Sequence, residues 1–172
     1  MGTLPTNYKA VAAIGYYSAA WAQDYDSPSR KAVRAVLYQN IRYAHMLGKF
    51  DTFITSMAPG FATDFAFAVL EFRKEYPVLL VACLTSPSQG RGYTGRDWNI
   101  FNELCSVDSI AVLTISSDES TENKVRLRDE AMVDMAEKVI SWPSSRSGNV
   151  RYALNYAKSK GKGEYNIKER CF

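Results

Sequence analysis

The sequence predicts an α/β fold in which a mostly parallel sheet is flanked by helices, a three-layer sandwich. Short apolar runs alternate along the chain with longer segments of helical periodicity, the rhythm of strand and helix in such folds. The run 78–84 is unbroken and apolar, which is typical of a strand buried on both faces. The chain has 172 residues, 47% of them apolar and 13% aromatic, which suits one compact domain over 1–172.

The first half of the chain predicts two strand-to-helix units. Ser27 is the expected N-cap of the first helix, and Gly48 follows its last apolar position. Pro77 is expected to end the second helix. In order, the predicted elements are a strand at 10–14, a helix at 28–47, a strand at 52–55 and a helix at 63–76.

The second half continues the alternation from the apolar run 78–84. A polar loop with three glycines is expected at 85–96, and the polar, acidic loop 116–123 is expected to lie on the surface because it has no periodicity. The predicted elements are a helix at 97–105, a strand at 109–115, a helix at 126–136, a strand at 138–141, a helix at 149–160 and an extended segment at 164–168.

Composition excludes several classes of protein. The 21 Lys and Arg against 18 Asp and Glu leave a net charge of +3, and no basic stripe is present, so we expect no nucleic-acid partner. Three scattered cysteines and the absence of a Cys-x-x-Cys pair indicate a cytoplasmic protein without a metal site. No apolar run is long enough to cross a bilayer, so no membrane association is expected.

Candidate ligand-binding residues follow from the rule that parallel sheets bind ligands beyond the carboxyl ends of their strands. Glycines that open helices expose backbone N–H groups to an anion, Asp64 can accept a hydrogen bond from a ribose hydroxyl, aromatic faces can stack on a base, and Arg128 can pair with a phosphate. The positions are Gly15, Tyr16, Tyr17, Ser56, Gly60, Asp64, Arg128, Trp142, Gly148, Asn149 and Arg151.

Each position also has a purely structural interpretation. Asp64 is favourable at the start of any helix, single aromatic residues are commonly core, and Arg128 is equally compatible with a solvated face. Catalytic signatures are missing, since the sequence has no G-x-S-x-G elbow, P-loop or G-x-G-x-x-G fingerprint. The single histidine, His45, lies within a long predicted helix, where packing is its expected role.

The order of these motifs resembles the SLOG superfamily, in particular its YpsA-like branch, which is related to the LOG and DprA families. The resemblance rests on 13–17, 56–64, Glu75-Tyr76-Pro77, Asp97-Trp98, Arg128-Asp129, 132–134 and Gly148-Asn149, and it spans nearly the whole chain. The chain departs from the family pattern at Tyr16-Tyr17, where the family has His-Arg, and at Asp129, where it has Asn. The glutamate of the nucleotide-cleaving branch is replaced by Val150, Arg151 and Tyr152, and Arg151 favours an anion.

The resemblance implies a Rossmann-like domain that binds a nucleotide or nucleotide-derived ligand as a sensor, carrier or sequestering protein. It further implies a homo-oligomer, no required cofactor and no efficient catalysis. Two alternatives stay open at this point. One is an N-glycosidic-bond hydrolase or transferase that uses a substitute carboxylate such as Asp64, and the other is a protein-interaction module with a decayed pocket.

Overall fold

A computed structural model describes residues 6–15, 25–107, 111–115, 120–143 and 147–168. It contains a six-stranded sheet in the order β4-β3-β2-β1-β5-β6, and every neighbouring pair of strands is parallel. The strands are β1 (Ala10–Gly15), β2 (Thr52–Thr55), β3 (Leu79–Leu84), β4 (Ala111–Thr114), β5 (Lys138–Trp142) and β6 (Gly163–Asn166).

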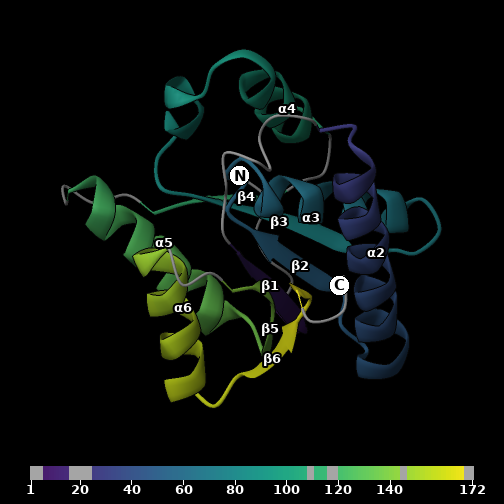
Figure 1. Cartoon of the computed structure of the whole chain (residues 1–172). Coiled ribbons are helices and arrows are strands. Elements are labelled where there is room, and N and C mark those ends of the chain that lie inside the picture. Colours follow the sequence, from purple (N-terminus) through teal and green to yellow (C-terminus); the bar gives the residue numbers. More distant parts are fainter. Residues whose placement is uncertain (1–5, 16–24, 108–110, 116–119, 144–146, 169–172) are drawn as a thin grey trace.

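Helices cover both faces of this sheet (Figure 1). One layer packs on the face that holds most of the phenylalanines, and the other packs on the opposite face, which is rich in alanine and valine. The first layer is α2 (Pro28–Gly48), α3 (Phe61–Arg73) and α4 (Gly95–Cys105), and the second is α5 (Thr121–Met135) and α6 (Gly148–Ser159). The predicted α/β sandwich with a parallel sheet is therefore confirmed.

Alternation along β1 shows how one strand serves both layers. Val11 and Ala13 belong to the core under α2 and α3, whereas Ala10, Ala12 and Ile14 belong to the core under α5 and α6. All five side chains are buried, because successive residues of a strand point to opposite faces. None of the described helices is both long and apolar enough to traverse a bilayer.

Four helices, α3, α4, α5 and α6, begin one to five residues before the expected positions, and for two of them a hydrogen bond at the start explains the difference. Helix α5 begins at Thr121, inside the segment expected as a loop, because the Ser120 hydroxyl caps it by accepting from the Asn123 N–H at 3.4 Å. Helix α3 begins at Phe61, since the Thr63 hydroxyl bonds with both backbone groups of Gly60 and fixes the turn there. The extended segment expected at 164–168 forms the parallel edge strand β6.

The order of the strands places a switch point between β1 and β5. The chain lays down β1 to β4 in one direction and then returns through α5 to place β5 on the other side of β1. The helices that follow β1 and β5, α2 and α6, consequently lie on opposite faces of the sheet. Such a divergence opens a crevice beyond the carboxyl ends of the two strands.

Candidate functional site

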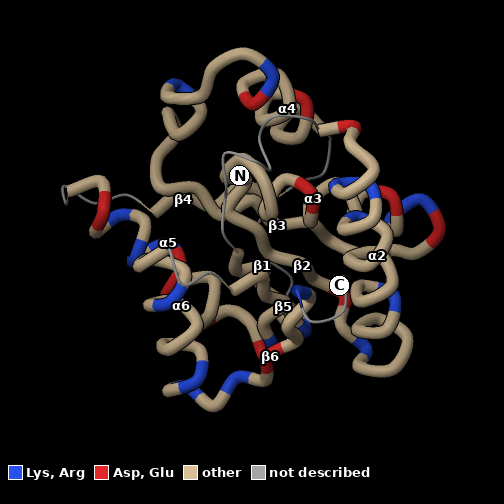
Figure 2. Tube along the Cα trace, viewed as in Figure 1, with Lys and Arg blue, Asp and Glu red and all other residues tan. Residues whose placement is uncertain are grey.

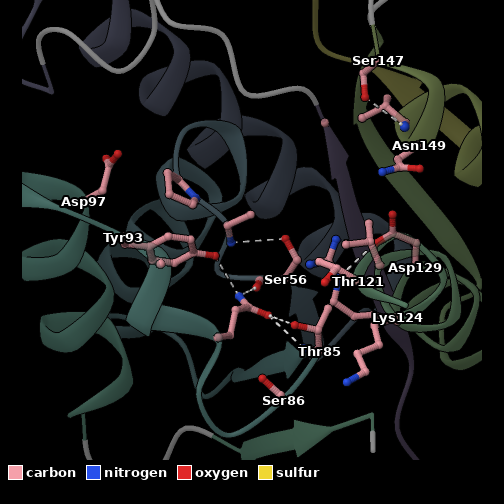
Figure 3. A pocket seen from close by; sticks show the side chains of 18 of the residues that line it. Ser56, Thr85, Ser86, Tyr93, Asp97, Thr121, Lys124, Asp129, Ser147 and Asn149 are labelled. Atoms are coloured by element: carbon pink, nitrogen blue, oxygen red, sulfur yellow. Dashed lines mark hydrogen bonds and ion pairs between the residues drawn. The ribbon is translucent and has the colours of Figure 1, made fainter. Parts of the chain in front are cut away.

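A cavity of about 740 Å³ lies at the carboxyl ends of the strands. Its lining comes from the end of β1, the segments after β2 and β3, and the first turns of α5 and α6 (Figure 3). Segments far apart in the sequence thus meet where the strand order reverses. The cavity occupies the position that the topology predicts for a ligand.

One wall of the cavity is fixed by the side chain of Gln89. Its Oε1 accepts from the Thr85 backbone N–H at 2.9 Å and from the Thr85 hydroxyl at 3.2 Å, while its Nε2 donates to the Ser56 carbonyl at 2.8 Å and to the Tyr93 hydroxyl at 3.2 Å. This network ties the short helix η1 (Gln89–Gly92) to the ends of β2 and β3. The wall is therefore preorganised.

Tyr93 presents an aromatic ring to the same wall. The ring packs edge-on against Phe101, with a centroid separation of 5.4 Å, and its hydroxyl is held by Gln89. Burial raises the pKa of Tyr93, and the hydrogen bond from Gln89 lowers it in part. The residue stays a neutral phenol at physiological pH.

Among the described lining residues, the basic side chains are Lys124 and Arg128, both from helix α5. Arg128 donates from Nε and Nη2 to the same Asp129 oxygen, at 3.0 and 2.7 Å, so much of its charge is compensated. Burial raises the pKa of Asp129, while the charge and hydrogen bonds of Arg128 act in the opposite direction. Among the described residues, the Lys124 ammonium has no ion-pair or hydrogen-bond partner (Figure 3).

Two helix N-termini also face the cavity, through Thr121 of α5 and through Ser147 and Asn149 at the start of α6. The Ser147 hydroxyl caps α6 by accepting from the Val150 N–H at 3.3 Å. The remaining N–H groups of a first turn and the positive end of the helix dipole favour an anion. Within the described part of the chain, no group of His, Cys, Asp and Glu is arranged to hold a metal ion.

Four of the predicted site residues line the cavity: Gly15, Ser56, Arg128 and Asn149. Gly15 is sterically required at the end of β1, because a Cβ there would overlap the ring of Phe61. Gly148 and Arg151 lie in the first turn of α6 and are exposed, beside the lining residues. Tyr16 and Tyr17 fall outside the described residues.

Three predicted contacts are corrected by burial. Asp64 is fully buried and faces α2, where it pairs with Arg30 and Arg34, so it cannot meet a ribose in the cavity. Trp142 is 8% exposed and packs against Phe61 in the core, so it does not cover a base. The Gly60 N–H donates to the Thr63 hydroxyl at 3.2 Å and is therefore unavailable to a phosphate.

The predicted set lacked several lining residues, among them Lys124, Gln89 and Tyr93. Gln89 and Tyr93 lie in the polar segment after β3, which the strand-end rule had marked only as a region. Lys124 was assigned to no element, because it lies between the predicted loop 116–123 and the predicted helix 126–136. The signal was the Ser120 cap, which puts Lys124 in the first turns of α5 on the side of the cavity.

Neither a family model nor a curated protein matches this sequence. The fold is similar to that of DNA processing protein A (DprA) from Streptococcus pneumoniae, with a TM-score of 0.58, 14% identity, and coverage of 92% of this chain and 50% of that one. It is also similar to DprA from Helicobacter pylori, with a TM-score of 0.61, 11% identity, and coverage of 94% and 70%. The chain spans about half the length of the Streptococcus pneumoniae protein.

These neighbours confirm the Rossmann-like α/β fold, whereas the SLOG superfamily and its YpsA-like branch stay a prediction. The Helicobacter pylori structure is described as showing a single-stranded DNA binding mode. Two expectations are corrected by this finding. The expectation of a nucleotide-derived small molecule gives way to single-stranded DNA, the ligand described for a protein of similar fold. Nucleic acid is therefore no longer excluded as a partner of this chain. A homo-oligomer and a cytoplasmic location stay predictions.

Proposed function

We propose that this chain binds single-stranded nucleic acid across the cavity at the switch point of its sheet. The observation that carries the proposal is the convergence of Lys124 and two helix N-termini on one cavity beside an aromatic wall. The structure of Helicobacter pylori DprA, which has a similar fold, is described as showing a single-stranded DNA binding mode. In this chain the cavity lies where open parallel sheets hold their ligands.

The sugar-phosphate backbone is assigned to the side of the cavity formed by α5 and α6. Lys124 supplies an ammonium group whose charge no described carboxylate neutralises, and the first turn of α6 supplies backbone N–H groups. Arg128 contributes less, because it shares its charge with Asp129. A net charge of only +3 gives modest overall attraction for nucleic acid, so binding depends on this local arrangement.

The bases are assigned to the opposite side, against Tyr93. A fixed aromatic ring stacks on any base without sequence preference, and such contacts are worth about 1 to 3 kcal/mol per base. Hydroxyls of Ser86, Ser88 and Thr94 border the same side and can bond with exposed base edges. Stacking on a wall requires an unpaired base, so single strands are favoured over a duplex.

Fluorescence anisotropy with a labelled oligonucleotide of about 16 nucleotides, repeated over a range of salt concentrations, tests this proposal. The variant Lys124→Gln is expected to weaken binding and to reduce the salt slope by about 0.7, the value of one phosphate contact on a single strand. Lys158→Gln is the matched control, because Lys158 is exposed near the end of α6 and lies outside the cavity lining.

Two results would overturn the proposal. One is the absence of saturable binding to single-stranded DNA or RNA by the unmodified protein. The other is an equal salt slope for the Lys124 and Lys158 variants, since it would place the contact somewhere other than the cavity. Duplex DNA of the same length is expected to compete at least tenfold less well, because its bases cannot reach Tyr93.

A further inference from the structure

Three arginines surround the ring of Tyr25, outside the cavity. The guanidinium carbons of Arg30, Arg34 and Arg96 lie 4.7, 4.3 and 5.2 Å from the ring centroid. They come from the first turns of α2 and α4, and Figure 2 shows the basic start of α2 beside the acidic start of α3. Arg30 is buried, so Arg34 and Arg96 are the members of this cluster that an anion can reach.

Buried Asp64 fixes two of these guanidinium groups. Its Oδ2 accepts from Arg30 Nε at 3.0 Å, and its Oδ1 accepts from Arg30 Nη2 and Arg34 Nη1, both at 3.0 Å. Arg34 Nη1 also donates to the Tyr25 carbonyl at 3.0 Å. The side chains are therefore held in place before any ligand arrives, which reduces the entropy lost on binding.

A groove of about 420 Å³ begins at this cluster and runs between α2 and α3. Its walls are the half-buried rings of Tyr25, Tyr38 and Phe67, and its polar ends are Arg34 and Glu71. The Tyr25 and Phe67 rings contact each other with a centroid separation of 5.2 Å. Aromatic walls with one cationic end match the flat base and the anionic backbone of a nucleotide.

Arg96 connects this groove to the cavity. Its neighbours Thr94 and Asp97 line the cavity, while its own guanidinium lies over Tyr25, which lines the groove. Arg96 is 56% exposed and pairs with Asp26, which is also exposed. An exposed ion pair costs little to rearrange, so the Arg96 guanidinium is accessible to a phosphate.

Resting on the proposed function, we propose that the groove between α2 and α3 is a second subsite, which takes one further nucleotide of the same single strand. The strand leaves the cavity along Arg96, its phosphate lies by Arg96 and Arg34, and its base enters between Tyr38 and Phe67. Glu71 at the far end pairs with Lys74 through its Oε2 at 2.5 Å, and its other carboxylate oxygen accepts a hydrogen bond from an exocyclic amino group. Adenine, cytosine and guanine are therefore preferred over thymine and uracil at this subsite.

The test compares labelled oligocytidine strands of about 4 and about 16 nucleotides, the limits of common single-strand site sizes. Ala35→Glu adds a carboxylate to the groove at an exposed position of α2, so it leaves the core intact. Asn155→Glu adds the same charge at an exposed position of α6, away from both sites. Circular dichroism melts verify that both variants fold.

We expect Ala35→Glu to weaken binding of the longer strand at least fivefold, the lower limit for one stacked base, and to leave the shorter strand unchanged. Asn155→Glu should change neither. Arg96→Gln should weaken the longer strand more than the shorter one. Photocross-linking of a strand with 5-iodocytidine should label a peptide that contains Tyr38 or Phe67.

Each contrary result has a separate meaning. If neither strand binds the unmodified protein, the proposed function itself fails. If both bind but Ala35→Glu matches Asn155→Glu for the longer strand, the groove is not a subsite and the cavity proposal stands. Cross-links confined to the peptide of Tyr93, or a stronger preference for oligothymidine over oligocytidine, would likewise overturn the groove assignment.

Discussion

Replacing Asp64 with asparagine is expected to destabilise the fold without acting on a ligand directly. Asp64 is completely buried in α3, and it accepts three hydrogen bonds from Arg30 and Arg34 of α2. Asparagine has nearly the same shape, so the change creates no cavity. It removes the negative charge and turns an NH₂ group toward guanidinium donors, which leaves Arg30 uncompensated at 5% side-chain exposure.

The expected cost is about 3 to 5 kcal/mol, the usual range when one member of a buried ion pair is removed. The sum of three charge-assisted hydrogen bonds, at about 1.5 to 3 kcal/mol each, would exceed this range, but contacts that share one carboxylate are not additive. For a chain of this size the melting temperature should fall by roughly 6 to 20 °C.

Urea unfolding followed by circular dichroism measures the loss, and an unchanged m-value would keep the comparison valid. The control is Asp26→Asn, which removes the carboxylate of an exposed ion pair with Arg96 and should leave the midpoint unchanged within error. A loss below about 1 kcal/mol for Asp64→Asn would refute the assignment of a structural ion pair. It would return Asp64 to the list of possible ligand contacts.

Other changes test the cavity and the cores. Asp129→Asn should raise affinity for single-stranded DNA about three- to tenfold, because Arg128 loses its internal counter-ion. Since burial raises the pKa of Asp129, affinity of the unmodified protein should increase as pH falls and that of the variant should not. Gly15→Ala should cost about 1 to 3 kcal/mol in urea unfolding, because its Cβ overlaps Phe61. Burial raises the pKa of Cys83 to about 11, so unfolding lets this thiol ionise at lower pH. Stability should therefore fall above the ordinary thiol pKa, less so in Cys83→Ala, and thiol reagents should label Cys83 only after unfolding.

Sequence pattern was sufficient for the layered architecture because it depends on burial. Both faces of the runs 10–14 and 78–84 are apolar, so both runs were expected to be strands of a parallel sheet. The structure confirms both strands. Helix starts were predicted less well, because they depend on single side chains. Ser120 starts α5 five residues before the predicted position, and the acidic composition of that segment concealed its cap.

The sequence predicted where the cavity lies but named only some of the residues that line it. The strand-end rule identified Gly15, Ser56 and Asn149, because position along the chain is enough to bring a residue to that edge. It cannot say which way a helical side chain points. Asp64 belongs to the first turn of α3 yet faces α2, because Arg30 and Arg34 lie there and a buried carboxylate requires compensation.

The orientation of the acidic residues also favours a strand over a compact ligand in the cavity. A pocket that grips one ribose needs an acceptor fixed at the end of a strand, and the carboxylate after β2 is committed to α2. Asp129 is committed to Arg128 on the other side. The rest of the lining of this cavity of about 740 Å³ includes an ammonium group, two helix N-termini and an aromatic wall, with the Asp97 carboxylate on the side of that wall. The first three of these attract phosphates and base faces without fixing a particular sugar, as a passing single strand requires.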